Sequence, residues 1–314
     1  MQLGIRTAIS RRLSQSFLDP HQDLSAARLI VGSGRSGTTW LQELACRAGK
    51  LRPVFEPFHA AREPGFSDVP FGRYIRPDAQ DHDLRGRVHE VLSGKLRSKW
   101  QDHLCHPGVY RGRVVKEIRN LLWAGWLSRN FPQVPIVYLI RHPLAVAASS
   151  RALDWAPEHF DRMARQPELF TDHLSKVGTA PDQLTSKWHR TVAAWCIENI
   201  VAIRTLAGTG AQLLIYEEAL ARPSSVSSVL EHLRVPADKL EGIRAPSVTT
   251  RPDSPIREAS GSSTSWTAST DAALVEEGMD MLRIFGFDDF FSPDGAVDCA
   301  ALRSAWDEAG GSRW

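Results

Sequence analysis

Gly32-Ser33-Gly34-Arg35-Ser36-Gly37-Thr38-Thr39-Trp40 is the stretch that decides the fold of this 314-residue chain. It follows Arg28-Leu29-Ile30-Val31, which has the composition of a short buried strand, and precedes apolar positions at helical spacing from Trp40 to Ala48. A glycine-rich loop between a strand and a helix gathers backbone N–H groups at the helix N-terminus, where the helix dipole favours an anion. The sequence therefore predicts a phosphate-binding loop, and the alternative is a turn that only reverses the chain.

The charge of this loop differs from that of ATP-binding loops. In the pattern G-x-x-x-x-G-K-[ST] a lysine follows the second glycine. Here Thr38 occupies that position, and the nearest cation is Arg35, two residues before the glycine. The loop therefore indicates a phosphate-like ligand other than ATP.

A second motif lies about a hundred residues further along the chain. The apolar run from Pro135 to Ile140 ends in Arg141, and Pro143 then favours a helix start. Arg141 is thus expected at the carboxyl end of a strand, where open α/β sheets bind ligands. Ser149, two helical turns later, can face it. A guanidinium and a hydroxyl together suit a phosphate monoester, and the alternative for Arg141 is a surface ion pair.

Both motifs resemble those of sulfotransferases that use 3′-phosphoadenosine 5′-phosphosulfate (PAPS). The family's 5′-phosphosulfate loop reads Lys/Arg-Ser-Gly-Thr-Thr-Trp, and its 3′-phosphate site pairs an arginine with a serine eight residues later. The arginine in the loop is similar to carbohydrate-type and bacterial members. The resemblance implies a PAPS contact for each of these residues: Gly34, Arg35, Ser36, Gly37, Thr38, Thr39, Trp40, Arg141 and Ser149.

A third segment resembles the family's Tyr-Glu-Asp-Leu segment, whose tyrosine lies near the nucleotide base. It runs from Ala211 to Glu218 as a buried-strand pattern that ends in Tyr216-Glu217. The resemblance implies that both Tyr216 and Trp40 lie near the adenine. The alternative is a tyrosine that only packs at the end of a strand.

The reaction needs a base that takes the proton of the acceptor hydroxyl. Glu56 lies in the apolar run Pro53–His59, and burial beside Phe55 and Phe58 is expected to raise its pKa towards useful base strength. Phe-Glu-Pro after an Arg-Ser-Gly loop also resembles carbohydrate sulfotransferases. Glu56 is therefore the predicted base, and His59 is the second candidate. The alternative for Glu56 is an exposed carboxylate before a turn proline, without a role in the reaction.

The segment Arg113–Arg119 resembles the place where cytosolic sulfotransferases carry Lys-Thr-His, with histidine as the base. This chain has Lys116-Glu117-Ile118 there, so the lysine is present and the histidine is not. Lys116, with Arg35, is expected to stabilise charge on the phosphosulfate bridge. Glu117 is expected to form an ion pair with a neighbouring arginine.

Strands that alternate with helices predict an α/β fold, with one domain built on a central, mostly parallel sheet flanked by helices. The resemblance implies that this domain has a P-loop-like PAPS-binding core. Hydrophobic residues make up 42% of the chain, enough for a large core. The predicted division is an N-terminal extension at 1–24, a sulfotransferase domain at 25–295 and a C-terminal tail at 296–314. A net charge of +2 gives no reason to expect a nucleic-acid partner.

The remaining composition bears on the compartment and on partners. Four scattered cysteines without a C-x-x-C pair favour reduced thiols in a cytoplasmic protein. Animal Golgi members of the family are membrane-anchored, so the resemblance without such an anchor implies a bacterial relative. No apolar run is long enough to span a membrane. An amphipathic helix that includes Leu3, Ile9 and Phe17 leaves a peripheral membrane contact or a homodimer open. No metal is expected.

The predicted reaction moves the sulfuryl group of PAPS to a hydroxyl, less readily an amine, of a small-molecule, carbohydrate or glycolipid acceptor. The segments Phe58–Gly108 and Ala152–Ser186 interrupt the strand–helix alternation and are expected to recognise that acceptor. Two alternatives remain open: an ATP-dependent small-molecule kinase with a divergent loop, and a nucleotide-binding regulatory or scaffold protein without turnover.

Overall fold

A computed structural model describes residues 17–155, 159–175, 177, 184, 186–236 and 264–311. Its centre is a five-stranded sheet in the order β3-β5-β2-β6-β7, with every neighbouring pair parallel. A parallel pair, β1-β4, lies apart from it. The strands are β1 (Phe17–Leu18), β2 (Ala27–Val31), β3 (Arg52–Phe55), β4 (Gly108–Val109), β5 (Arg113–Glu117), β6 (Ile136–Ile140) and β7 (Gln212–Ile215).

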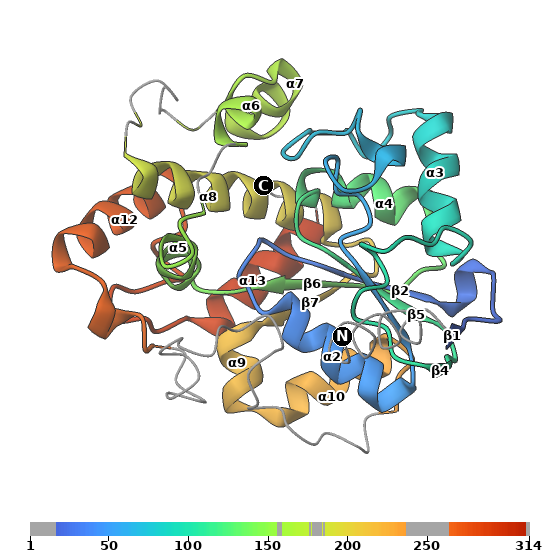
Figure 1. The fold of residues 1–314 in the computed structure, drawn as a ribbon. Coiled ribbons are helices and arrows are strands. Elements are labelled where there is room, and N and C mark those ends of the chain that lie inside the picture. Colours follow the sequence, from blue (N-terminus) through green and yellow to red (C-terminus); the bar gives the residue numbers. More distant parts are fainter. Residues whose placement is uncertain are drawn as a thin grey trace, which may run out of the picture.

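Helices cover both faces of the sheet, with α2, α9 and α10 on one face and α4 and α8 on the other (Figure 1). Their bounds are α2 (Thr38–Gly49), α3 (His82–Leu92), α4 (Ala124–Asn130), α5 (Pro143–Arg151), α6 (Phe160–Ala164), α7 (Pro167–Leu169), α8 (Lys187–Leu206), α9 (Tyr216–Ala221), α10 (Pro223–His232), α12 (Ala272–Phe285) and α13 (Cys299–Gly310). Short 3₁₀ turns lie at Leu24–Ala26, Pro64–Phe66, Leu121–Trp123 and Thr267–Ser269, and a π turn lies at Phe170–Leu174. This architecture confirms the predicted α/β fold.

Each face of the sheet has its own apolar core. Every residue of β2, β5 and β6 is buried, because helices cover the parallel sheet on both faces. Most of these residues are apolar, and the charged ones include Arg113, Lys116 and Glu117 of β5. Ile30 and Leu139 pack towards α2 and α10, whereas Leu29 and Tyr138 pack towards α4 and α8. The neighbours alternate in this way because successive side chains of a strand point to opposite faces.

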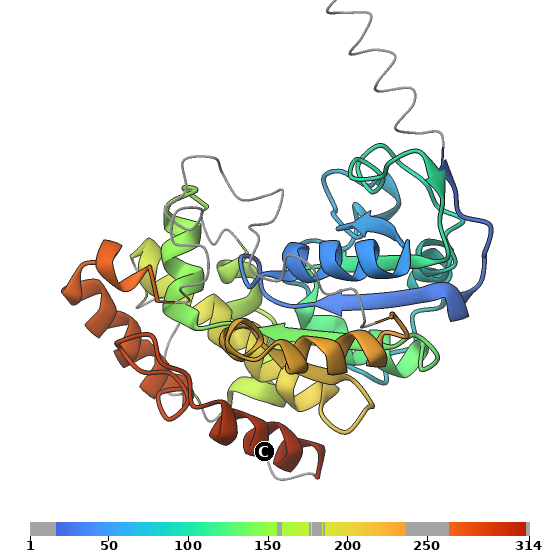
Figure 2. The same cartoon turned by 90° about the horizontal axis from the view of Figure 1, so that it is seen from below.

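Both ends of the described chain pack against this sheet. Asp19 follows β1 and binds two fully buried arginines, Arg52 of β3 at 3.3 Å and Arg113 of β5 at 2.9 Å. Near the other end, Trp306 of α13 stacks on Tyr138 of β6 with 5.6 Å between ring centroids. Figure 2 shows α12 and α13 across the molecule from the N-terminal strands. The described parts of 1–24 and 296–314 thus belong to the same packed body as the sheet.

The predicted N-terminal amphipathic helix lies, apart from Phe17, outside the described residues. Phe17 itself is in β1, opposite Gly108 of β4, and is not helical. Among the described helices, none combines the length and the apolar character that a membrane crossing requires.

Candidate active site

The loop between β2 and α2 turns sharply just before the helix. Gly37 caps α2 with a φ of 96°, and a Cβ there would come within 2.7 Å of the Tyr216 ring. No described side chain caps the start of α2, so its first N–H groups are available to an anion. Thr38 and Thr39, in the first turn, are both buried. The predicted strand–loop–helix order is confirmed, and Gly37 is the residue that permits the turn.

The loop and the second motif meet at the carboxyl edge of the sheet. Nε of Arg35 donates to Oγ of Ser149 at 3.0 Å. Nη1 of Arg141 donates to the carbonyl oxygen of Arg35 at 3.0 Å, and its guanidinium lies 4.6 Å from the Tyr216 ring centroid. Residues far apart in the sequence therefore form one cationic group, because β2 and β6 are adjacent and end at the same edge.

Two polar atoms in this group are buried without a hydrogen-bond partner among the described residues. They are Oγ of Ser36 and Nε of Arg141. Such atoms cost free energy unless a ligand or water pairs with them. Phosphate oxygens would accept from both, so the group fits an anionic ligand.

The two aromatic residues predicted near the adenine contact each other. Trp40 of α2 and Tyr216 lie edge to face with 5.7 Å between ring centroids. Trp40 is buried, whereas Tyr216 is partly exposed. Tyr216 begins α9 and does not end β7, so its ring turns back over Gly37. Of the two, Tyr216 is the ring that a ligand can reach directly.

A side-chain hydrogen bond fastens the loop from the opposite side. Nδ2 of Asn199, on α8, donates to Oγ of Ser33 at 3.0 Å, and its Oδ1 accepts from the hydroxyl of Tyr138. Asn199 and Tyr138 are fully buried. The loop is therefore held in place by the core of the sheet before any ligand binds.

Glu56 lies at the centre of a buried charge cluster at the ends of β3 and β5. Nζ of Lys116 lies 2.7 Å from Glu56 Oε1, and Nε of Arg119 lies 3.1 Å from Oε2. Glu56 is 3% exposed and Lys116 is 1% exposed. Nζ of Lys116 also lies 3.6 Å from the Phe55 ring centroid. Both carboxylate oxygens are thus occupied by cations.

The electrostatics of Glu56 differ from the expectation. Burial raises its pKa, but the charges of Lys116 and Arg119 and their hydrogen bonds outweigh burial, so the pKa lies below the usual value. The prediction that Glu56 is buried is confirmed, whereas the prediction of a raised pKa is wrong. The reason is the pair of cations, which the apolar sequence around Glu56 did not reveal.

Glu117 has a different environment from the predicted one. Its carboxylate accepts from the backbone amides of Ile118, Arg119 and Phe58 at 2.9, 2.8 and 3.3 Å. Burial first, and then the charge of Glu56, raise its pKa to about 7. The expected ion pair with an arginine is therefore wrong, because backbone amides take both oxygens.

His59, the second candidate base, is half-buried at the rim of the Glu56 cluster. Its Nδ1 accepts from the amide of Ala61 at 3.2 Å, and its ring meets Trp100 edge to face. Burial, reinforced by the Arg119 charge, lowers its pKa. This environment favours the neutral form of His59.

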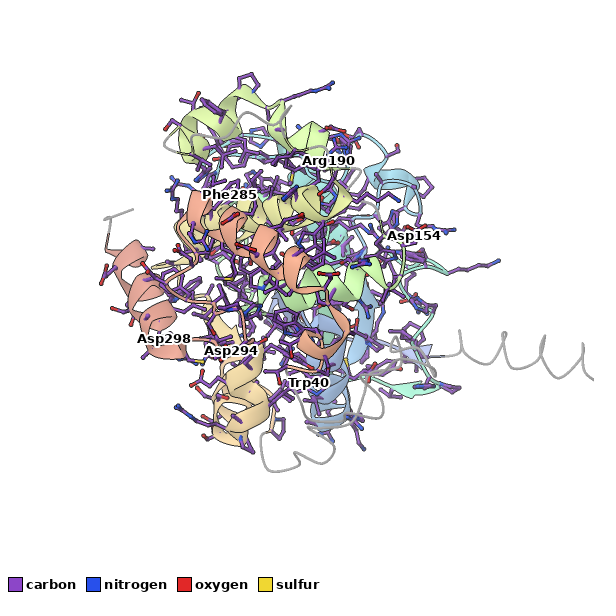
Figure 3. All side chains as sticks on the ribbon, turned by 90° about the vertical axis from the view of Figure 1, so that its left-hand side faces the viewer. Trp40, Asp154, Arg190, Phe285, Asp294 and Asp298 are labelled. Atoms are coloured by element: carbon purple, nitrogen blue, oxygen red, sulfur yellow. The ribbon has the colours of Figure 1, made fainter. Side chains whose placement is uncertain are left out.

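A cavity of about 370 Å³ opens beside the loop. Ser33 and Gly34 form one wall, and Ile118 and Arg119 form another. The remaining wall comes from Phe71, which lies in the segment before α3, and from α5, the segment after it and α8, through Val146, Ser150, Asp154, Trp155, His159, Thr191, Ala194, Trp195 and Glu198. The α8 side of the sheet carries Arg190, whereas Trp40 lies on the α2 side (Figure 3). Arg119 both lines this cavity and pairs with Glu56, so the cavity connects the loop with the Glu56 cluster.

Sequence reasoning missed the polar members of this cavity, His159 and Glu198. Thr191, Trp195 and Glu198 lie on one face of α8 because they are spaced by about one and two helical turns. That spacing was readable, but it does not distinguish a cavity wall from a packed face. Within the described ranges, no group of three or more His, Cys, Asp or Glu side chains is arranged to hold a metal.

The solved structures that are similar to this chain include two sulfotransferases. The chain is similar to the crystal structure of a sulfotransferase from Alicyclobacillus acidocaldarius, at 16% identity and a TM-score of 0.39 over 88% of this chain and 97% of that one. It is also similar to the sulfotransferase domain from the curacin biosynthetic pathway, at 16% identity and a TM-score of 0.38 over 82% of this chain and 96% of that one. No curated protein matches the sequence.

The family comparison covers the loop, the Arg141 motif and the Tyr216 segment. The model of the sulfotransferase family matches residues 29–238, more than half of the chain. The predicted family is confirmed, and the protein belongs to the sulfotransferase family.

Proposed function

We propose that the protein transfers the sulfuryl group of PAPS to a hydroxyl group of its acceptor. The observation that carries this proposal is the hydrogen bond of 3.0 Å between Arg35 of the loop and Ser149 of the second motif. PAPS has a 5′-phosphosulfate and a separate 3′-phosphate, and two anion-binding motifs on one sheet edge match that arrangement. The chain of phosphates in ATP would leave the second motif unused.

The donor would use the contacts described above. The amides at the start of α2 and the guanidinium of Arg35 would hold the 5′-phosphosulfate, with hydroxyl contacts from Ser36, Thr38 and Thr39. Arg141 and Ser149 would hold the 3′-phosphate. The Tyr216 ring, and Trp40 behind it, would lie near the adenine. The unpaired Nε of Arg141 and Oγ of Ser36 would then find acceptors.

The chemical step is an attack by the acceptor oxygen on sulfur. The bond between oxygen and sulfur forms as the bond from sulfur to the bridging phosphate oxygen breaks, and 3′-phosphoadenosine 5′-phosphate leaves. The acceptor proton passes to Glu56. Lys116 and Arg35 stabilise the negative charge that develops on the bridging oxygen.

The two cations that lower the pKa of Glu56 are compatible with its role as the base, because the bound donor would compete for them. An anionic phosphosulfate competes with Glu56 for Lys116 and for Arg119, which lines the cavity. A carboxylate that loses such partners while it stays buried has a higher pKa. Donor binding would therefore convert a stabilised carboxylate into a stronger base at the moment it is needed.

The test is a calorimetric titration with 3′-phosphoadenosine 5′-phosphate, ADP, and ATP with magnesium. We expect the bisphosphate to bind at least about tenfold more tightly than ADP, because a charge-assisted pair is worth roughly 1.5–3 kcal/mol. Arg141→Ala should remove this preference. Arg129→Ala, which alters an exposed arginine at the end of α4, is the matched control and should retain it.

Two other results would contradict the proposal. Tighter binding of ATP with magnesium would favour the kinase alternative. Binding of the bisphosphate without any sulfuryl transfer from PAPS to an acceptor panel, together with unchanged function in Glu56→Ala, would favour the regulatory or scaffold alternative. The acceptor panel should include carbohydrates, glycolipids and phenols, since aromatic walls such as Phe71 and Trp155 suit sugar rings and phenols alike.

A further inference from the structure

The Glu198 carboxylate lacks a hydrogen-bond donor in the part of the chain that the structure describes. Glu198 is 5% exposed and lines the cavity beside the loop. The titratable side chain next to it is His159, whose Nε2 lies 3.3 Å from Oε1 and which carries a charge only when it is protonated. That approach does not form a hydrogen bond, since Nε2 of His159 is itself buried without a partner. A carboxylate in this position is costly unless a donor or a cation pairs with it.

Three cations near the cavity have partners other than Glu198. Nε of Arg35 donates to Ser149 at 3.0 Å, and the Arg35 guanidinium lies 5.7 Å from the Trp155 ring centroid. Arg119 lies on the opposite wall and binds Glu56 at 3.1 Å. Lys187 pairs at 3.3 Å with Asp154, a highly exposed carboxylate. Among the described residues no lysine or arginine is paired with Glu198, so a cationic ligand in the cavity can pair with its carboxylate.

The walls around Glu198 suit a cation with an apolar body. The rings of Phe71, Trp155 and Trp195 line the same cavity, and the face of an aromatic ring attracts an ammonium group. Gly34 of the loop forms another wall, and the volume of about 370 Å³ lies in the range of small-ligand sites. A ligand in this cavity can therefore contact Glu198 with one end and lie beside the donor loop with the other.

We propose that the acceptor is a hydroxyl compound that also carries an ammonium group. The ammonium binds Glu198 between the aromatic rings, and the hydroxyl lies beside the loop, where the sulfuryl group is transferred. This inference rests on the proposed function, because it takes the cavity as the acceptor site. It adds to that function a positively charged substrate class and a specificity-determining residue.

The test uses two probes that differ in a single group, tyramine and its neutral analogue tyrosol. Each is titrated calorimetrically into the full chain saturated with 3′-phosphoadenosine 5′-phosphate. We expect tyramine to bind at least about tenfold more tightly, because it supplies a charged partner to a buried carboxylate. Glu198→Gln should reduce this preference to within about twofold, since the amide carries no charge. Equal binding of the two probes, or no binding of either, would overturn the inference.

Saturation with the bisphosphate separates this inference from the proposed function. If the bisphosphate itself does not bind, the proposed function fails. If it binds and tyramine shows no preference, only the acceptor inference fails.

Two further variants keep the result interpretable. Asp154→Asn removes a cavity-lining carboxylate that is exposed, and it should leave the preference for tyramine unchanged. An equal loss of the preference for tyramine in Asp154→Asn would mean that the ammonium responds to the combined negative charge of several carboxylates, and it would overturn the assignment to Glu198. His159→Phe removes the neighbour of Glu198 while it preserves stacking on Phe71, so the preference should be at least as large as in the wild type. A loss of preference there would also overturn the inference, even if Glu198→Gln does not fold.

Discussion

The donor group around Arg35 and Arg141 and the cluster around Glu56 are two sets of charges built on opposite principles. In the donor group, Arg35 donates to the Ser149 hydroxyl and Arg141 donates to the Arg35 carbonyl oxygen, and two buried polar atoms, Oγ of Ser36 and Nε of Arg141, have no hydrogen-bond partner among the described residues. In the Glu56 cluster, the carboxylate is enclosed by Lys116 and Arg119. The first needs a ligand to complete it, whereas the second is already complete.

This difference indicates what each region contributes. Substitutions in the donor group should weaken ligand binding with little effect on folding, because the missing partner is the ligand. Substitutions in the Glu56 cluster should destabilise the fold, because each leaves a buried charge without its partner. The following predictions test this distinction.

The largest effect is expected for Glu56→Gln. It leaves Lys116, which is 1% exposed, without a counter-charge, and we expect a loss of about 3–5 kcal/mol in the free energy of unfolding. Urea denaturation measures this loss. The double variant Glu56→Gln/Lys116→Met removes both charges and should recover much of it. A double variant as unstable as the sum of its parts would contradict the coupling.

The second effect is the pH dependence caused by Glu117. Its pKa is about 7 in the folded chain, compared with an ordinary value of 4.5 when the chain is unfolded, so the folded state holds the proton more tightly. Stability from this group is full below pH 4.5 and falls as the pH rises through about 7. Between those limits the loss is roughly 3 kcal/mol.

Glu117→Gln removes this pH dependence. The difference in unfolding free energy between the variant and the wild type should therefore shift in favour of the variant by that amount from pH 4.5 to 8. Chemical denaturation at several pH values measures the shift. A difference that stays constant over this range would show that Glu117 does not titrate there.

The third prediction compares two glycine variants, Gly37→Ala and Gly210→Ala, to distinguish backbone strain from side-chain packing in the loop. Gly37→Ala places a Cβ 2.7 Å from the Tyr216 ring at a φ of 96°. We expect about tenfold weaker binding of 3′-phosphoadenosine 5′-phosphate, about 1.4 kcal/mol, because the added methyl group must displace the Tyr216 ring or the loop. The φ penalty of about 1–2 kcal/mol should lower the stability of this variant and of the control alike. Gly210→Ala is the control, because Gly210 has a φ of 85° and open space around it. If both variants lose the same stability and neither loses affinity, the contact with Tyr216 does not shape the site.

The smallest effect is expected for Ser149→Ala. It removes the acceptor of the 3.0 Å hydrogen bond from Arg35 and a hydroxyl near the predicted 3′-phosphate. A hydrogen bond is worth about 1 kcal/mol, so affinity for the bisphosphate should fall about fivefold, with little change in stability. Ser224→Ala, at an exposed position of α10, should change neither quantity. A larger change in melting temperature than in affinity would place Ser149 among the structural residues.

The sequence by itself determined the elements whose causes are local. The order of strand, loop and helix around Gly37, and the position of Arg141 at the end of β6, follow from hydrophobic runs and from the backbone preferences of glycine and proline. The sequence placed Ser149 opposite Arg141, whereas in the structure Ser149 accepts a hydrogen bond from Arg35; what the sequence predicted was the sheet edge where Arg141 lies.

Only the tertiary structure decided properties that depend on charges and walls from distant segments. The direction of the Glu56 pKa shift depends on Lys116 and Arg119, which reach it from the end of β5. The surroundings of Glu198 on α8 depend on His159, which comes from another segment of the chain. The physical reason is range: backbone preferences act between neighbours in the sequence, whereas burial and electrostatic pairing act through space and are fixed only when the sheet brings those segments together.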